Sequence, residues 1–395
     1  MRSVGIICEC NPYHSGHQYL ARCARESGAD CVVGVMSGYF TERGEAAICD
    51  PYFRAEALIK GGFDLVLELP YPFSASSAEF FASAGVHILS SLSVDELWFG
   101  SECGDLSLLE RAAEIAMRDD FSEQYGASTS TSDGTAHAFA NCLSAFLGGD
   151  VSLSSNDLLG VAYLCAIKRQ GSAMQAHTVR RIGSAYLDVT VREGEHPSAT
   201  AIRSILFGEG LDAAAKWILP ESLYALRAAI KEDLAPASLC FAERAVLAHL
   251  RQMQSGDADG IAELEGGLGN RLIHAAREAR SIEELMRLAA TKKYTDSRIR
   301  RGILFSMTGV FAEDLREMPH YVRVLAAGER GCELLARNRR QKGIVAVTKQ
   351  AELPTDAASQ RQAELQRRAI GLYAICLDQI ADEGTFLRKK PLILK

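Results

Sequence analysis

Short apolar runs alternate with stretches of helical periodicity over the first half of the chain. The apolar runs have the length of buried strands, and they lie at residues 3–10, 31–36, 64–70, 96–99 and 174–182. Between them, apolar residues recur at helical spacing in residues 50–61, 74–89, 104–118 and 155–169. Strands that alternate with helices in this way form βαβ units, so the pattern predicts a mainly parallel sheet.

Helical periodicity dominates the chain beyond about residue 210. The clearest helical patterns there lie at residues 220–232, 237–255 and 281–290, while strand signals fade. We therefore predict an α/β fold of two domains: a Rossmann-like domain with a parallel sheet over residues 1–210, and a mostly α-helical domain over residues 211–395. Residues 126–134 are rich in Ser, Thr and Gly, which predicts a loop or linker.

The composition is that of a soluble globular protein. Hydrophobic residues make up 48% and charged residues 24% of the chain, and no apolar run is long enough to cross a membrane. Glu9, Asn11 and His14 interrupt the first apolar run too early for a signal peptide, so we expect a cytoplasmic protein. The 11 scattered cysteines favour reduced thiols. Cys8 and Cys10 are too close for a typical zinc pair and lack a second ligand pair, so no metal site is predicted.

The C-terminal part of the chain is basic although the formal net charge is −7. From Met286 to Lys395 there are 21 Lys and Arg against 12 Asp and Glu. Within it, one short segment combines basic residues with an aromatic ring, a composition that suits RNA phosphates and bases. The residues predicted to bind such a polyanion are Lys292, Lys293, Tyr294, Arg298, Arg300 and Arg301. The alternative is a solvated charged surface of helices.

Two histidines follow the first predicted strand in the segment Asn-Pro-Tyr-His-Ser-Gly-His, residues 11–17. His14 and His17 are three residues apart near the start of a helix, where backbone amides and the helix dipole favour an anion. Gly16 lacks a Cβ, so the backbone there can approach a flat ring or a phosphate closely. The segment therefore predicts a phosphate site; the alternative is that the histidines only cap the helix or bind a metal.

A second anion site is indicated by a helix start further along the chain. Ser198 and Thr200 offer hydroxyls there, and Arg203 follows within the first turns. The alternative is that the hydroxyls are plain caps and the arginine is solvated. In a parallel sheet, ligands bind beyond the carboxyl ends of the strands. The positions expected to converge there are His14, His17, Ser37, Gly38, Gly100 and Ser101.

Several motifs carry a family resemblance. Residues 14–17 resemble the H-x-G-H signature of the HIGH-type nucleotidyltransferases. Beyond it, nearly the whole chain is similar to the bacterial tRNA(Met) cytidine acetate ligase family. The matching stretches are residues 9–17, 35–45, 64–70, 99–102, 155–157, 180–181 and 292–301. The most specific one, M-S-G-x-F-x-x-R-G-E, has Glu42 and then Ala46 where the family usually has Gln and Pro.

The resemblance implies a HIGH-type nucleotidyltransferase domain that binds ATP through residues at the matching motifs. These ATP-binding residues are Ile7, Cys8, Glu9, Cys10, Asn11, Pro12, Tyr13, His14, Ser15, Gly16, His17, Gln18, Tyr19, Leu20, Gly100, Asn156, Arg180 and Arg181. Ser198, Thr200 and Arg203 resemble the second signature S-S-T-x-I-R and would contact phosphate, with Ala199 replacing its second Ser.

The implied chemistry has two steps. Acetate attacks the α-phosphate of ATP and forms acetyl-adenylate, while the catalytic residues His14 and His17 stabilise the developing charge and Arg180, Arg181 and Mg²⁺ neutralise phosphates. The N4 amine of the wobble cytidine of elongator tRNA(Met) then takes the acetyl group, giving N4-acetylcytidine. The expected partners are tRNA and acetate, with no membrane and no protein partner.

Two other functions stay open from the sequence. A small-molecule adenylyltransferase of the pantetheine-phosphate or nicotinate-nucleotide type would share both signatures but would not need the basic helical C-terminal part. An inactive nucleotide-binding or RNA-binding relative would keep the sheet, although the intact histidines, Asn156 and arginine pair argue against it.

Overall fold

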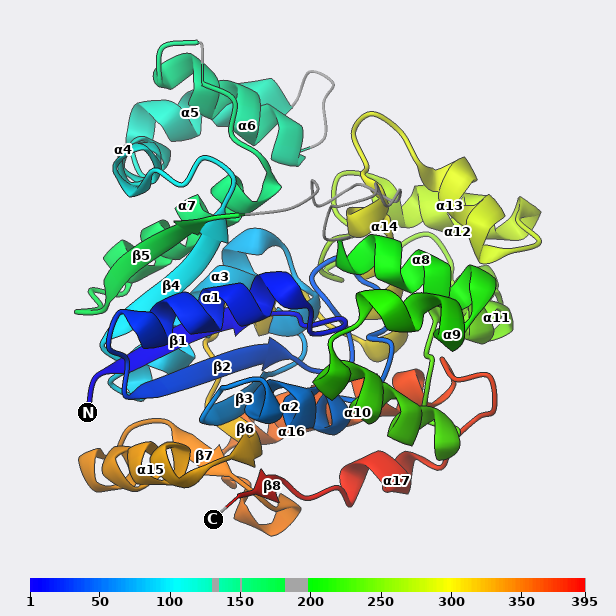
Figure 1. Ribbon diagram of the computed structural model, residues 1–395. Coiled ribbons are helices and arrows are strands. Elements are labelled where there is room, and N and C mark those ends of the chain that lie inside the picture. Colours follow the sequence, from blue (N-terminus) through cyan, green and yellow to red (C-terminus); the bar gives the residue numbers. More distant parts are fainter. Residues whose placement is uncertain (130–134, 150, 182–197, 395) are drawn as a thin grey trace.

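One twisted sheet runs through the computed structural model, which describes residues 1–129, 135–149, 151–181 and 198–394. Within these residues the strand order is β5-β4-β1-β2-β3-β6-β7, and β8 pairs with β6 (Figure 1). The strands are β1 (Ser3–Cys8), β2 (Cys31–Ser37), β3 (Leu65–Leu69), β4 (Glu96–Ser101), β5 (Gln175–Arg180), β6 (Tyr321–Ala327), β7 (Val345–Val347) and β8 (Leu392–Ile393).

Helices connect the strands of the first half, and all but the two at residues 119–129 and 135–146 lie where the sequence predicts them. They are α1 (Ser15–Glu26), α2 (Pro51–Lys60), α3 (Ala78–Ser91), α4 (Leu106–Ala116), α5 (Asp119–Thr129), α6 (Thr135–Phe146) and α7 (Ser155–Arg169). Strands β1 to β5 pair in parallel. Helix α1 lies in front of the sheet in Figure 1 and α3 behind it. Every residue of β1, β2 and β3 is buried, because helices cover both faces of a parallel sheet, and apolar residues predominate in these strands.

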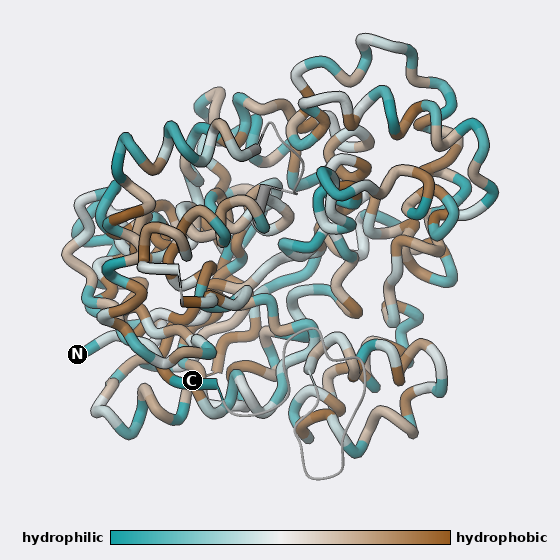
Figure 2. Tube along the Cα trace, turned by 90° about the horizontal axis from the view of Figure 1, so that it is seen from above, coloured by the Kyte–Doolittle hydropathy of each residue, from teal (hydrophilic) through white to brown (hydrophobic). Residues whose placement is uncertain are grey.

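The second half is mostly helical, as predicted. Its helices are α8 (Ala199–Glu209), α9 (Leu211–Ala214), α10 (Pro220–Lys231), α11 (Glu243–Gln252), α12 (Leu268–Glu278), α13 (Ile282–Ala289), α14 (Asp296–Thr308), α15 (Glu329–Gln341), α16 (Ala357–Ala374) and α17 (Glu383–Leu387). Figure 2 shows apolar stretches in the interior of the molecule and polar stretches toward its periphery.

The prediction that strands fade beyond residue 210 is wrong for the three C-terminal strands. Strand β6 pairs antiparallel with β3, and β7 and β8 each pair with β6. The sequence of β6, YVRVLAA, is a short apolar run that periodicity cannot assign to a strand or a helix. In the folded protein this run forms a strand because the edge of β3 supplies its hydrogen-bonding partners. The division at residue 210 stays a prediction, although the sheet takes strands from both sides of it.

The loop predicted at residues 126–134 is partly wrong. Residues 126–129 belong to α5, and residues 130–134 lie outside the described residues. Aromatic side chains of α5 and α6 explain the helix. The ring centroids of Phe121 and Phe139 are 5.3 Å apart, and those of Tyr125 and Phe139 are 5.5 Å apart. This packing outweighs the local preference of Gly, Ser and Thr for a loop.

Membrane spans and clusters of metal ligands are both missing from the described part of the chain. Among the helices that the structure describes, none has the length and apolar character needed to cross a bilayer. Nor do the described residues gather three or more His, Cys, Asp or Glu side chains that could hold a metal ion. All 11 cysteines are free thiols, in agreement with the sequence prediction.

Candidate active site

A cavity of about 1480 Å³ opens at the carboxyl ends of the parallel strands. It is lined by most of the residues predicted to bind ATP: Ile7, Cys8, Glu9, Cys10, Asn11, His14, Ser15, Gly16, His17, Gln18, Tyr19, Leu20, Gly100, Asn156, Arg180 and Arg181. Pro12 and Tyr13 lie elsewhere, beside a small separate cavity on the far side of the turn. The expected convergence of distant motifs at one end of the sheet is therefore confirmed for His14, His17 and Gly100.

Backbone amides in the turn at residues 14–17 hold the two imidazole rings through their Nδ1 atoms. His14 is the N-cap of α1, and its Nδ1 accepts a hydrogen bond from the Gly16 amide at 3.0 Å. The Nδ1 of His17 accepts from the His14 amide at 3.3 Å. A neutral imidazole that accepts at Nδ1 carries its proton on Nε2. The two rings, with centroids 4.0 Å apart, therefore each carry an Nε2–H donor beside the cavity.

The ring of His14 needs the space that Gly16 leaves free. A Cβ at this position would lie 2.9 Å from Cε1 of His14. The sequence predicted that Gly16 allows a close approach, and the structure shows that the approaching group is the imidazole of the same turn. A side chain at this position would therefore push the ring of His14 out of its capping position.

His17 is held in its neutral form. Burial lowers the pKa of His17 well below its usual value of 6.5, and the nearby His14 and Arg181 lower it further. At physiological pH the ring is therefore a hydrogen-bond donor without a full positive charge. Permanent positive charge in the cavity comes instead from arginines, and Arg180 and Arg181 are among those that line it.

The opposite wall is organised by a carboxylate to which the sequence motifs gave no role. Glu102 follows β4 and accepts a hydrogen bond from Nδ2 of Asn156 at 2.6 Å. It also accepts from the Ser154 hydroxyl and lies 3.6 Å from Nε of Arg181. A Cβ on Gly100 would meet Cγ of Arg181 at 3.2 Å, so the glycine leaves room for that side chain. In the sequence, the one signal that could have indicated a role for Glu102 was its position as the last residue of the motif F-G-S-E.

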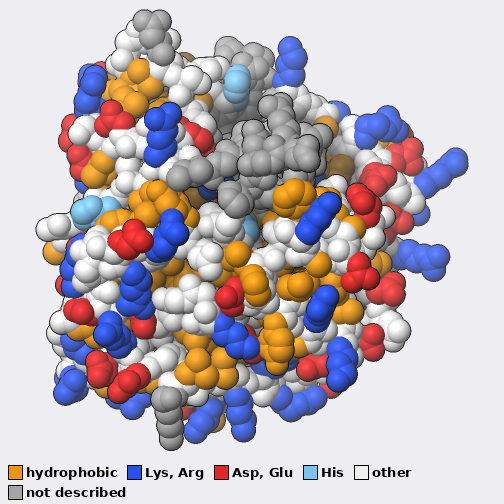
Figure 3. Space-filling view, viewed as in Figure 1, with side chains coloured by type: hydrophobic (Ala, Val, Ile, Leu, Met, Phe, Trp, Pro, Cys, Tyr) orange, Lys and Arg blue, Asp and Glu red, His pale blue; other side chains and the backbone are white. Residues whose placement is uncertain are grey.

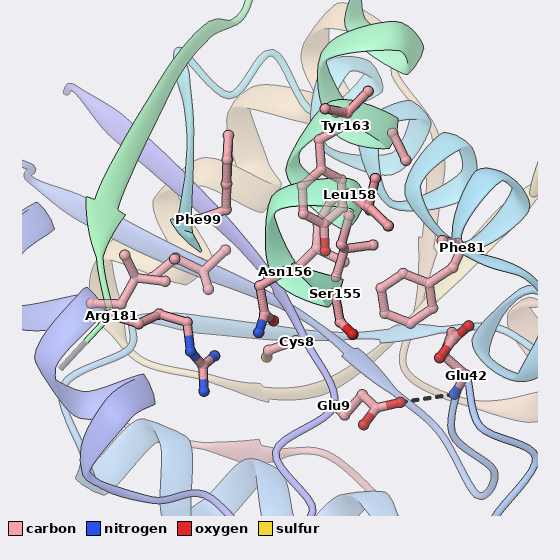
Figure 4. Close-up of a pocket in the computed structure, with 18 of the residues that line it drawn as sticks. Cys8, Glu9, Glu42, Phe81, Phe99, Ser155, Asn156, Leu158, Tyr163 and Arg181 are labelled. Carbon is pink, nitrogen blue, oxygen red and sulfur yellow. Dashed lines mark hydrogen bonds between the residues drawn. The ribbon is translucent and has the colours of Figure 1, made fainter. Parts of the chain in front are cut away.

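Two glutamates face the cavity from the turns after β1 and β2. Oε1 of Glu9 accepts a hydrogen bond from the amide of Glu42 at 2.8 Å, as Figure 4 shows. Burial raises the pKa of Glu9, and it raises the pKa of Glu42 to about 7. Sequence analysis named Glu9 only as part of the nucleotide-binding turn and Glu42 only as a departure from the family.

A buried arginine ties these turns together. Arg54 on α2 is 3% exposed and donates to the carbonyl oxygens of Glu9 at 2.7 Å and Ser37 at 2.9 Å. It also donates to the carbonyls of Gly38 and Cys49. Sequence analysis expected Ser37, Gly38 and Ser101 at the ligand crevice, but none of the three lines the cavity. Ser37 and Gly38 instead help to hold Arg54.

Ser198 and Arg203 of the second predicted phosphate motif form hydrogen bonds with other residues of the protein. Ser198 caps α8, accepting from the Ala201 amide at 3.1 Å, and it lines the cavity. Thr200 does not line it. Arg203 donates to the Asn11 carbonyl at 2.9 Å and to Glu45 at 2.6 Å. Arg203 therefore links α8 to both loops of the site, and its direct contact with phosphate stays a prediction.

The basic segment at residues 292–301 reaches the cavity, but most of its side chains are already paired. Tyr294 is 8% exposed and its hydroxyl donates to the Gly266 carbonyl, so the stacking of a base on this ring is not supported. Arg298 binds the carbonyls of residues 263 and 265. Arg301 lies between Glu263, at 2.8 Å, and Glu42, at 3.4 Å. Arg300 is 3.9 Å from Glu45.

Lys292 and Lys293 are the exposed basic residues of this segment, and Lys293 donates to the Gly266 carbonyl at 3.0 Å. Thr295, Ser297 and Arg301 line the cavity. On the face of the molecule that Figure 3 shows, Lys and Arg side chains lie among acidic ones rather than in one basic surface. The segment therefore joins the helical part of the chain to the site instead of forming a separate basic surface.

Known proteins resemble this chain along nearly its whole length. The model of a family described as HIGH Nucleotidyl Transferase matches residues 1–385. A tRNA(Met) cytidine acetate ligase of Caldanaerobacter subterraneus is 34% identical over 391 residues, which cover 96% of this chain and 97% of that protein. The chain belongs to the tRNA(Met) cytidine acetate ligase family.

Other members of the ligase family support the assignment along the whole chain. The tRNA(Met) cytidine acetate ligase of Bacillus subtilis is 30% identical, with 96% of this chain and 93% of that protein covered. The solved structure of apo Thermotoga maritima TmcAL superposes with a TM-score of 0.92 at 29% identity, and the form bound with alpha-thio ATP gives 0.90 at 28%; both cover 100% of each chain. The resemblance found from the motifs is thus confirmed, together with the HIGH nucleotidyltransferase fold.

Proposed function

We propose that this protein activates acetate with ATP and transfers the acetyl group to N4 of the wobble cytidine of elongator tRNA(Met). The observation that carries the proposal is the pair of Nε2–H donors of His14 and His17 in one cavity with Arg180 and Arg181. A related TmcAL that matches this chain over its full length is bound with alpha-thio ATP, which supports a nucleotide in the same cavity.

In the first step an acetate oxygen attacks the α-phosphorus of ATP. The new bond joins the acetate oxygen to phosphorus, and the bond from phosphorus to the bridging oxygen breaks, so that pyrophosphate leaves. His14 and His17 donate hydrogen bonds to the oxygens on which charge develops. Arg181, aligned by Glu102, neutralises negative charge from the other wall.

A magnesium ion fits this site as an ion that the phosphates of the nucleotide coordinate. Magnesium is commonly held by one or two carboxylates together with substrate phosphates, rather than by a cage of protein ligands. The described residues form no cluster of metal ligands, so ATP phosphates would supply most of its coordination, and Glu9 or Glu42 could add a carboxylate. The ion would offset phosphate charge as the pyrophosphate leaves.

In the second step the N4 amine of the cytidine attacks the acetyl carbon and AMP leaves. The tRNA approaches along the segment that contains Lys292 and Lys293, since this segment is exposed and its neighbours Thr295 and Ser297 line the cavity. Contacts of the two lysines with phosphate would place the anticodon over the site. The reaction belongs in the cytoplasm, where tRNA is modified.

The deciding experiment is mass spectrometry of nucleosides from unmodified elongator tRNA(Met) after incubation with the protein, ATP, Mg²⁺ and acetate. N4-acetylcytidine should form only when ATP and acetate are both present. Pyrophosphate exchange into ATP should also require acetate. Exchange without acetylated tRNA would refute the acceptor, and the absence of both would favour a small-molecule adenylyltransferase or a binding protein.

A further inference from the structure

We propose that the apolar part of the active-site cavity binds the base of the target cytidine, unstacked from the anticodon loop of the tRNA. We call this part the apolar compartment, and it is lined by Phe81, Phe121, Tyr125, Phe139, Leu158 and Ala162. The inference rests on the proposed function and names the place where its second substrate binds. Sequence analysis gave these six residues no role.

The cavity is larger than the site of a single small molecule. Its volume is about 1480 Å³, whereas a pocket for one small ligand typically has roughly 300–1,000 Å³. The residues expected to bind ATP lie at the end of the cavity next to the sheet, around His14, Gly100 and Arg181. Acetate is a very small ligand. Room for a second large group therefore remains.

Helix α7 runs from the nucleotide end of the cavity into the apolar compartment. Asn156 in its first turn lies at the nucleotide end, and Leu158 and Ala162 follow on the cavity side, one helical turn apart. Residues that line the cavity continue to the end of α7, over about 20 Å of helix. Figure 4 shows Arg181 and Phe81 on opposite sides of Asn156. The polar and apolar parts of the cavity are therefore adjacent but distinct.

Aromatic rings on α5 and α6 form another wall of the compartment. The rings of Tyr125 and Phe139 are half-buried and lie at 88° to each other, with centroids 5.5 Å apart. Phe121 is 1% exposed and packs against both rings. These contacts hold the rings in place before a ligand arrives. Aromatic side chains bind unpaired bases by stacking, so this wall suits a flat ring.

The part of the chain expected to bind tRNA lies next to this compartment. Thr295 and Ser297 at the start of α14 line the same cavity. Burial raises the pKa of the Tyr125 hydroxyl, Glu79 raises it further, and Arg298 of α14 lowers it. Helices α5 and α14 are thus close enough for their side chains to interact. A tRNA held by the exposed lysines before α14 would present an unstacked base to the compartment.

The base of the cytidine fits the compartment better than the other two substrates do. ATP has polar partners at the nucleotide end, and acetate carries a single methyl group. Enzymes that modify a base take it out of its stack and hold it between aromatic or apolar side chains. A cytosine ring held in this way stacks its faces on the aromatic wall. Its polar edge, with the N4 amine, then faces the end of the cavity where acetyl-adenylate forms.

Filling the compartment tests the proposal. Ala162→Trp places a large ring on the α7 wall, away from the residues expected to bind ATP. We expect single-turnover transfer of acetyl to tRNA to fall about 100-fold or more, while acetate-dependent pyrophosphate exchange stays within about threefold of the wild type. Ala336→Trp at an exposed position of α15 is the matched control and should change neither rate.

Removing one ring is a milder test that stays informative if Ala162→Trp fails to fold. Phe139→Ala should raise the KM for tRNA in the transfer step about 5- to 100-fold, because one stacking contact is lost. Acetate-dependent exchange should not change. Phe241→Ala, which removes a ring that is 44% exposed and lies outside the cavity, is the matched control.

A crosslink locates the base without relying on activity. The probe is the anticodon stem-loop of elongator tRNA(Met) with 5-iodocytidine at the wobble position, irradiated in complex with the wild-type protein. Mass spectrometry should map the crosslinks to residues of the apolar compartment. Crosslinks found only elsewhere would overturn the proposal.

The other outcomes separate this inference from the proposed function. Equal loss of exchange and transfer in a folded Ala162→Trp would assign the compartment to ATP, and transfer at the wild-type rate would show that no base binds there. Exchange that the wild type supports with butyrate and Ala162→Trp does not would assign the compartment to the acid. Each of these results overturns the inference. A wild type that forms no N4-acetylcytidine refutes the proposed function, whereas N4-acetylcytidine with crosslinks outside the compartment overturns this inference alone.

Discussion

At the scale of single residues, the site depends on hydrogen bonds that fix tautomers and orientation. His14 and His17 use Nδ1 to cap α1, which places the proton of each ring on Nε2 beside the cavity. The capping that the sequence offered as the alternative is confirmed, and the phosphate contact stays a prediction. Capping is what directs the other nitrogen, so the two roles belong together.

Replacing either histidine should abolish most of the activation step. We expect His14→Ala and His17→Ala to lower acetate-dependent pyrophosphate exchange about 10²- to 10³-fold, because each removes one donor to the developing charge. The affinity for tRNA, measured by filter binding, should not change. His274→Ala, which removes an exposed histidine of α12, is the control. A histidine variant with normal exchange would contradict the mechanism.

Gly16 offers a test of geometry without a change in chemical groups. We expect Gly16→Ala to lower exchange about 10- to 100-fold, because its Cβ would displace the His14 ring, and small displacements of a catalytic group cost this much. Gly208→Ala in α8 is the control, since its Cβ would meet nothing within 4 Å. That control should raise the free energy of unfolding by roughly 0.5–1 kcal/mol. Equal activities of the two variants would rule out the steric argument.

At the scale of elements, strand β6 attaches the C-terminal part of the chain to the first half. The pairing places Arg323 on β6 3.7 Å from the buried Glu68 on β3, and Glu68 also accepts from Gln366 on α16 at 2.9 Å. Burial raises the pKa of Glu68 to about 7. We therefore expect the contact between the two strands to depend on pH.

The sign of this dependence follows from linkage. A carboxyl with a raised pKa in the folded state stabilises the fold below its usual value of 4.5, and this contribution disappears as the pH rises through about 7. We expect urea unfolding to show that Glu68→Gln gains up to about 3 kcal/mol relative to the wild type between pH 5 and pH 8. Glu26→Gln, at an exposed site on α1, should show no such gain. A constant difference between Glu68→Gln and the wild type would contradict the assignment.

At the scale of the whole molecule, the helical part of the chain contributes directly to the active site. Arg203 of α8 and Arg301 of α14 contact the loops that follow β1 and β2. The exposed Lys292 and Lys293 lie just before α14. A tRNA bound to these lysines would therefore reach the cavity without crossing a separate domain.

Neutralising both lysines should weaken the binding of tRNA and leave the reaction of acetate with ATP unchanged. We expect Lys292→Gln together with Lys293→Gln to weaken tRNA binding and to lower the slope of log affinity against log salt by about 1 for each phosphate that no longer meets a lysine. Acetate-dependent pyrophosphate exchange should remain. The control is Lys231→Gln at an exposed position of α10. An unchanged salt slope would move the tRNA site elsewhere.

The sequence by itself determined the local features of this protein. The βαβ alternation, the helix starts at His14 and Ser198, and the positions of His14, His17, Gly100, Asn156 and Arg181 could all be read from short segments. Such features depend on neighbours within a few residues, and the motifs that contain them are compact. For the same reason the sequence was sufficient to identify the family.

Other features depend on contacts between residues that are far apart in the chain, and only the tertiary structure decided these. It made residues 321–327 a strand by supplying the edge of β3, and it buried Tyr294 and Arg301 in contacts that removed them from the expected RNA surface. It also showed that Glu9 is fixed by Arg54 and by the Glu42 amide. Glu9 and Glu42 are 33 residues apart in the chain, and local periodicity contains no information about such distances.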